Sequence, residues 1–175
     1  MQDTITAPPA GLDRDVFLRQ LLRELAGVLE EVVGLQEAEG FVALVGQRIA
    51  DWMDAGYRQA YGVDALSAKE VAEVLVDLKR RIQGGFRLVS ISDEAIVLSN
   101  DRCPFGDLVK GRVSLCQMTT SVFGTITAEN LGYARVHIDE SIAAGFPGCK
   151  VRIALLPTHP ADSAPGVEFV RGARA

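Results

Sequence analysis

The sequence lacks the features that are typical of nucleic-acid-binding proteins and of membrane proteins. Its longest basic stretch is Lys79-Arg80-Arg81, and its formal net charge is −5. Because phosphate binding needs Lys and Arg clustered on one face, this charge balance argues against nucleic acid as a partner. No apolar run approaches the roughly 20 residues that span a bilayer, and the start MQDTITAPPAG lacks the charged and apolar segments of a signal peptide. We therefore expect a cytoplasmic protein with no membrane contact.

The sequence also shows no recognisable catalytic motif. No glycine loop followed by Lys and Ser or Thr marks a nucleotide site. The chain has two histidines, His137 in an expected strand and His159 in the C-terminal stretch, and neither is well placed as a general base for a cysteine. We therefore expect that the protein is not an enzyme.

The length and composition describe an ordinary globular domain. With 175 residues, of which 48% are apolar and 23% charged, the chain can bury a core of its own. Prolines and small residues dominate both ends. We expect a flexible N-terminal tail over residues 1–12, a single α+β sensory domain over 13–157 and a flexible C-terminal tail over 158–175.

The first half of this domain reads as three helices. The first runs from Asp13 to about residue 33 and carries apolar residues three and four apart, Leu18, Leu21, Leu25, Val28 and Val32. Such a seam predicts a homodimer formed through residues 13–33. The second runs from about Phe41 to Tyr61, with bulky core residues on one side, and the third begins at the capping box Ser67–Glu70.

The second half adds strands around a fourth helix. Two β-rich runs over 86–91 and 95–98 predict a hairpin, and runs over 133–138 and 150–156 predict two more strands. The helix between them begins at a second capping box, Ser114–Gln117, and ends at Gly132. The order ααα-ββ-α-ββ favours an α+β fold with helices packed on one face of an antiparallel sheet.

The sequence contains three cysteines, each at an expected element boundary. Cys103 follows the first hairpin, Cys116 lies in the first turn of the fourth helix, and Cys149 heads the last strand. If that helix packs on the sheet, Cys103 and Cys116 come close. Cys149 joins them only if the last strand begins at the same edge.

These cysteines have two interpretations. The helix dipole lowers the pKa of a thiol in a first helical turn, so Cys116 is expected to form a thiolate, the species that zinc and iron–sulfur clusters bind. Buried cysteines also serve as small apolar core residues. The gaps of 12 and 32 residues between them match no standard zinc-finger spacing, so the residues alone leave both interpretations open.

Several motifs resemble the methanogen output domain family. They are Cys103-Pro-Phe-Gly106, Leu115-Cys116 with Met118-Thr119, Val122-Phe123-Gly124, Ala128-Glu-Asn-Leu-Gly-Tyr-Ala134, and Gly145 with Gly148-Cys149. The chain is more distantly similar to 4-vinyl reductase domains and to the sensor half of iron–sulfur assembly repressors. The resemblance covers roughly residues 15 to 157. It implies a fold of the haem-nitric-oxide-binding and trafficking-subunit type, often dimeric, and a ligand-sensing or signal-output role.

In the repressors, a similarly spaced set of cysteines binds a cluster. The resemblance therefore implies that Cys103, Cys116 and Cys149 hold zinc or an iron–sulfur cluster. The repressors carry four cysteines and a DNA-reading winged helix, whereas this chain has three cysteines and no recognisable recognition helix. A fourth ligand would come from water, a small molecule, a partner chain or a carboxylate such as Asp107.

The expected function is that of a signal-sensing or regulatory domain. It binds a metal, a cluster or a small ligand near the three cysteines and signals through a regulatory protein partner. Two alternatives remain: a small hydrolase with Cys116 as nucleophile, and a structural interaction module with buried thiols.

Overall fold

The computed structural model describes residue 11, residues 13–157 and residues 165–172. The first half consists of α1 (Arg14–Val33), α2 (Leu35–Tyr61) and α3 (Ala68–Arg81). The strands are β1 (Arg87–Ile91), β2 (Ala95–Asn100), β3 (Tyr133–Glu140), β4 (Cys149–Ala154) and β5 (Val167–Val170). Between β2 and β3 lie the short turns η1 (Gly106–Val109) and η2 (Val113–Leu115) and then α4 (Cys116–Leu131), and η3 (Ile142–Ala144) precedes β4. No helix among these residues is long and apolar enough to cross a bilayer.

Local sequence signals set the helix ends. The Ser67 side chain accepts a hydrogen bond from the Glu70 amide while the Glu70 carboxylate accepts one from the Ser67 amide, so the predicted capping box at α3 is confirmed. Asp13 caps α1 by accepting a hydrogen bond from the Val16 amide at 2.9 Å. Gly34 separates α1 from α2 with a φ of 88°, a value that a residue without a Cβ adopts readily.

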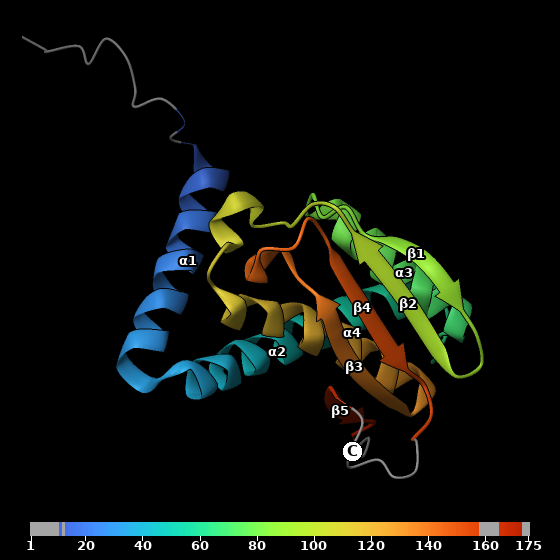
Figure 1. The fold of residues 1–175 in the computed structure, drawn as a ribbon. Coiled ribbons are helices and arrows are strands. Elements are labelled where there is room, and N and C mark those ends of the chain that lie inside the picture. The colour runs from blue at the N-terminus through green and yellow to red at the C-terminus, as the bar shows by residue number, and fades with distance from the viewer. Residues whose placement is uncertain (1–10, 12, 158–164, 173–175) are drawn as a thin grey trace, which may run out of the picture.

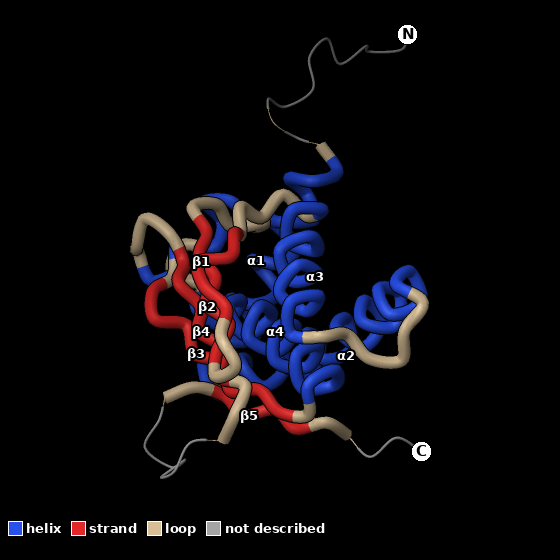
Figure 2. The backbone as a smooth tube through the Cα atoms, turned by 90° about the vertical axis from the view of Figure 1, so that its right-hand side faces the viewer, coloured by secondary structure: helices blue, strands red, loops and turns tan. Residues whose placement is uncertain are grey.

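The sheet has five strands in the order β1-β2-β4-β3-β5, and every neighbouring pair is antiparallel. Helices α2, α3 and α4 lie on one face of it, and α1 stands to the side of the sheet, packed against α2 (Figure 1, Figure 2). The predicted α+β fold class is therefore confirmed. In the pairing of β2 with β4, Asn100 at the end of one strand stands opposite Cys149 at the start of the other. The chain that leaves β2 toward α4 and the chain that enters β4 therefore lie at the same end of these strands.

Helix α4 is the centre of the core. It packs between the sheet and α2 (Figure 2), and every residue from Thr120 to Ala128 is buried. A helix that neighbours cover on all sides needs no polar face. Gly46 permits the close approach of α2, because a Cβ there would stand 2.8 Å from the Cβ of Ser121.

Two helix predictions need correction. The expected capping box at Ser114 is wrong: the 3-10 turn η2 leads directly into α4, whose N-cap is Leu115, and the Ser114 hydroxyl instead donates to Glu30. The second helix begins at Leu35 rather than near Phe41, and the bulky residues assigned to its core face are largely exposed. Trp52 is 73% exposed and Phe41 53%, because α2 packs on α4 through a narrow face of small residues, Ala38, Val42, Gly46 and Ala50.

The expected flexible tail over 158–175 contains a strand. Residues Val167–Val170 form β5 and pair with β3, so the expectation is wrong for this segment. Phe169 lies against Gly124 of α4, where a Cβ would stand 2.1 Å from its ring. The apolar contact of Phe169 with the core holds this strand in place together with its pairing to β3. The expected tail over 1–12 lies outside the described residues apart from Gly11, as do 158–164 and 173–175.

Candidate functional site

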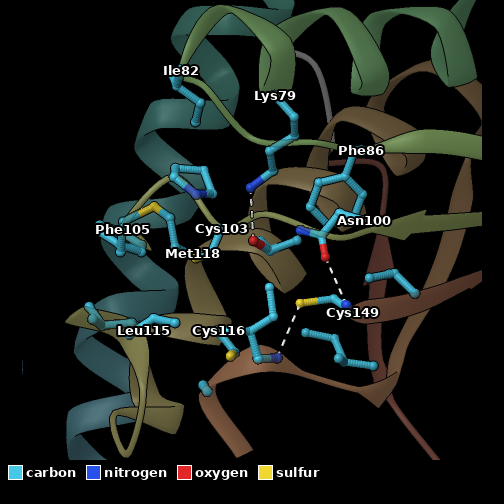
Figure 3. A pocket seen from close by; sticks show the side chains of 17 residues that line it. Lys79, Ile82, Phe86, Asn100, Cys103, Phe105, Leu115, Cys116, Met118 and Cys149 are labelled. Atoms are coloured by element: carbon cyan, nitrogen blue, oxygen red, sulfur yellow. Dashed lines mark hydrogen bonds between the residues drawn. The ribbon is translucent and has the colours of Figure 1, made fainter. Parts of the chain in front are cut away.

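A pocket lies at one end of the central strands, where β2 ends, β4 begins and α4 begins. All three cysteines line it, together with residues of α3 and the turns η1 and η2 (Figure 3). The sequence did not decide whether the last strand begins near Cys103 and Cys116. The pairing of Asn100 with Cys149 shows that it does. The free volume is about 60 Å³, well below the roughly 300 to 1,000 Å³ of pockets for drug-sized ligands. The pocket therefore suits a small molecule or an ion rather than haem, flavin or a nucleotide.

Hydrogen bonds from backbone amides fix Cys149 and Cys103 in the wall of the pocket. The Cys149 amide donates to the Asn100 side-chain oxygen at 2.7 Å, and the Ile142 amide donates to the Cys149 sulfur at 3.5 Å (Figure 3). The Cys103 carbonyl accepts from the Gly106 amide at 2.9 Å, which closes a tight turn before η1. Two of the three thiols are thus held by the loops that flank the strand ends.

The three thiols are half-buried, and burial shifts the ionisation of Cys103 and Cys116. It raises the pKa of Cys103, and it raises the pKa of Cys116 to about 11 despite a hydrogen bond with Ser141. The expected lowering of the Cys116 pKa by the helix dipole is therefore wrong, because desolvation of the thiolate outweighs it. In the described structure Cys116 is a protonated thiol at neutral pH.

Lys79 is the functional candidate that the sequence analysis missed. It is 3% exposed, and its ammonium points into the pocket from α3 (Figure 3). The Nζ atom donates to Thr119 Oγ1 at 2.8 Å and stands 5.2 Å from the Phe123 ring and 5.5 Å from the Phe86 ring. Burial lowers the pKa of Lys79 to about 8, and the negative charge that the three cysteines acquire when they ionise opposes this shift in part.

Among the described residues, no Asp or Glu forms an ion pair with Lys79. An ammonium group carries three donor protons, and the hydrogen bond to Thr119 uses one of them. The sequence did hold a signal for this position. Lys79 follows Leu75 by one helical turn on the buried face of α3, where a charged residue without a partner is rare.

The cysteines share the pocket but do not converge as a metal site. Within the described residues, no group of three or more His, Cys, Asp or Glu side chains is arranged to hold a metal ion. Asp107, the candidate fourth ligand, has a side chain that is 90% exposed and forms an ion pair with Lys110 at 2.7 Å. Metal or cluster binding by Cys103, Cys116 and Cys149 stays a prediction.

Helix α1 covers the outer wall of this site. Ala26 packs with Val109, Leu115 and Ile142, and Cys103 and Cys116 lie against the same apolar cluster. Two polar contacts add to this packing. The Arg23 guanidinium donates to the carbonyls of Leu108 and Lys110, and Glu30 accepts from Ser114 at 2.6 Å and pairs with Arg112 at 3.3 Å. The inner face of α1 is therefore joined to the chain segment that walls the pocket.

Comparison with known families decides the relationship. Residues 21–154 match the family described as methanogen output domain 1. The chain belongs to this family. The predicted membership is thereby confirmed. The matched residues include every helix and strand of this methanogen output domain except the first turns of α1 and the strand β5. Among curated proteins, no sequence matches this chain.

Two solved structures share the fold of this methanogen output domain. One is the phenol-responsive sensory domain of the transcription activator PoxR with phenol, with a TM-score of 0.61, 12% identity and coverage of 82% of this chain and 75% of that chain. The other is a trafficking protein particle complex subunit 3 from Naegleria fowleri covalently bound to palmitic acid. It has a TM-score of 0.56, 12% identity and coverage of 79% of this chain and 95% of that chain. At these identities the likeness concerns the fold, which agrees with the predicted trafficking-subunit type.

Proposed function

We propose that this chain is a sensory or regulatory domain that binds a small ligand in the cysteine-lined pocket. The ligand is compact and mostly apolar, and it presents one anionic or hydrogen-bond-accepting group to Lys79. This proposal rests on the Lys79 ammonium, which is buried in the pocket with one hydrogen bond and no acidic partner among the described residues. A buried ammonium is costly without further partners, and a ligand oxygen would supply one.

The walls of the pocket define the rest of the ligand. Apart from Lys79, Asn100 and Thr119, the lining side chains are apolar residues and thiols, including Phe86, Met118 and Ile138. Such a lining binds hydrocarbon surface and leaves orientation to a few polar groups. Two proteins with this fold carry organic molecules: the PoxR domain is with phenol, and the trafficking subunit is covalently bound to palmitic acid. The phenol case supports a small organic ligand here.

The contacts of α1 supply a route for signalling. Arg23 and Glu30 hold α1 to residues 108–114, and the pocket lies directly behind this segment. A ligand that displaces the η1 and η2 turns would alter these contacts and the position of α1. A regulatory protein partner would then respond to α1.

A matched set of probes tests the ligand proposal. Toluene, phenol and benzoate share one ring and differ in having no polar group, a hydroxyl or a carboxylate. We expect phenol and benzoate to raise the melting temperature by an amount that grows with the logarithm of their affinity, and toluene to raise it least. In Lys79→Met, benzoate affinity should fall by about 10- to 150-fold, the worth of a hydrogen bond to a charged group.

Lys69→Met is the control, because the Lys69 side chain is 81% exposed on the same helix. Unchanged benzoate binding in Lys79→Met, or the absence of binding by all three probes, would contradict the proposal. Calorimetry gives the affinities directly.

Metal binding by the three cysteines is a second candidate, favoured by their shared pocket. Elemental analysis and an ultraviolet–visible spectrum of protein purified without oxygen test it. Stoichiometric zinc, or iron with sulfide absorbance, would support it, and three free thiols without metal would exclude it. The hydrolase alternative is disfavoured by the raised pKa of Cys116, since a catalytic cysteine acts as a thiolate.

A further inference from the structure

The outer face of α1 carries an unusual amount of apolar surface. Its large side chains are about half exposed or more, in a continuous row along the helix: Phe17, Leu18, Leu21, Leu25, Val28 and Val32. Val32 is 75% exposed and Val28 55%. The inner face is already occupied, since Ala26 and Gly27 are buried against the segment that walls the pocket. The row therefore faces away from its own domain.

The spacing of these side chains indicates what packs against them. Leu18, Leu25 and Val32 take position a of a heptad repeat, and Arg14, Leu21 and Val28 take position d. Residues at a and d form the seam through which one helix packs on another of the same kind. Helix α1 has 20 residues and is thus about 30 Å long, enough for two such heptads.

The position of Arg14 favours an antiparallel pairing. In a parallel pair, position d faces position d, so the two Arg14 side chains would meet and repel each other. In an antiparallel pair, a residues face d residues, so Leu18 meets Val28, Leu25 meets Leu21 and Val32 meets Arg14. Arg14 then lies beside Glu31 of the second copy. Both are exposed, and neither forms an ion pair within the described chain.

We infer that α1 is an interface with a second copy of this chain, in which the two α1 helices run antiparallel and Arg14 of each pairs with Glu31 of the other. This inference is independent of the ligand proposal, because it rests on the outer face of α1. The same helix is joined through its inner face to the pocket wall by Arg23 and Glu30. The interface consequently lies one helix away from the pocket.

A charge-reversal cycle on the full chain tests the interface. Sedimentation equilibrium of the unmodified protein should give twice the chain mass of 18.8 kDa. Arg14→Glu and Glu31→Arg should each weaken the dimer by roughly 3- to 30-fold, because each exposed ion pair occurs twice in a symmetric dimer. The double variant should restore most of the lost affinity, which an unrelated loss of folding would not do.

An apolar variant separates this interface from others. Leu21→Asp, in the middle of the row, should give a folded monomer with an unchanged circular dichroism spectrum. Trp52→Asp on α2 is the control, because Trp52 is also exposed but lies off α1, and it should leave the dimer intact. A monomeric unmodified protein would overturn the inference. So would a dimer that Trp52→Asp dissociates and Leu21→Asp does not, or a double charge reversal that fails to restore association.

Discussion

The carboxylate of Glu30 accepts a hydrogen bond of 2.6 Å from the hydroxyl of Ser114, two residues before Cys116. Ser114 is fully buried, and the same carboxylate pairs with Arg112 at 3.3 Å. The last turn of α1 is thereby joined to the turn that leads into α4. A side chain of the outer helix thus helps to position the start of the helix that carries Cys116.

Glu30→Ala should loosen this side of the pocket. Loss of the carboxylate leaves the buried Ser114 hydroxyl without its acceptor, which should lower the free energy of unfolding by about 1 to 3 kcal/mol. Alkylation of Cys116 should also become faster. Urea unfolding and mass spectrometry of alkylated protein measure the two effects. Glu24→Ala, which removes a carboxylate bonded to Gln20 on the exposed surface of α1, should change neither.

Lys79→Met should stabilise the protein at neutral pH. The pKa of Lys79 is lowered from 10.5 to about 8 in the folded state, so the buried charge destabilises the folded chain below pH 8. This penalty disappears as the pH rises from 8 to 10.5, because the unfolded chain then holds a proton that the folded chain has released. The stability advantage of Lys79→Met should therefore shrink by about 3 kcal/mol between pH 7 and pH 10.5.

Urea unfolding at a series of pH values measures this difference. Comparing the variant with the unmodified protein at each pH removes most of the contribution of Cys103 and Cys116, whose raised pKa values act in the opposite direction at alkaline pH. A difference that does not change with pH would show that Lys79 is not desolvated.

Cysteine reactivity should be low at neutral and mildly alkaline pH. With a pKa of about 11, Cys116 at pH 8 should carry roughly a hundredth of the thiolate of an unperturbed thiol. Iodoacetamide should accordingly react with Cys116 much more slowly than it reacts with the free thiol of glutathione. Fast, selective modification of Cys116 would instead favour the hydrolase, and protection that a chelator removes would favour a metal.

Gly124→Ala should destabilise the packing of β5. A Cβ at this position would stand 2.1 Å from the Phe169 ring, and such overpacking costs about 1 to 3 kcal/mol. In the background of Phe169→Ala the ring is gone, so the same substitution should be neutral or slightly stabilising, because Ala favours helix more than Gly does. A double-mutant cycle of unfolding free energies tests this coupling. Equal effects of Gly124→Ala in both backgrounds would contradict the contact.

A buried polar cluster should matter more than any surface ion pair. The Asn130 amide donates to Asp54 at 2.6 Å and to the Ile126 carbonyl at 2.8 Å, and its oxygen accepts from the Leu66 amide at 2.8 Å. Asn130→Ala leaves Asp54 and the Leu66 amide without these partners, so unfolding should become easier by about 2 to 5 kcal/mol. Lys69→Ala, which breaks an exposed pair with Glu73 at 3.9 Å, should change it by less than about 1 kcal/mol.

Local signals in the sequence predicted much of the fold. The capping box at Ser67, the glycines at the helix ends and the alternating β runs gave the elements in their observed order, because each depends on residues close in the chain. The motifs around Cys103 and Cys149 gave the family. The exposed bulky residues of α2 and the strand β5 were not predicted, since both depend on which distant surface packs against them.

The candidate site divides in the same way. The sequence by itself determined the three cysteines, their positions at element boundaries and the apolar repeat of α1. Only the tertiary structure decided that β4 begins opposite the end of β2, which brings Cys149 to the same pocket as Cys103 and Cys116. It also decided that Lys79 is desolvated there and that burial, rather than the helix dipole, sets the pKa of Cys116. Desolvation depends on all the atoms around a group, and those atoms come from segments far apart in the chain.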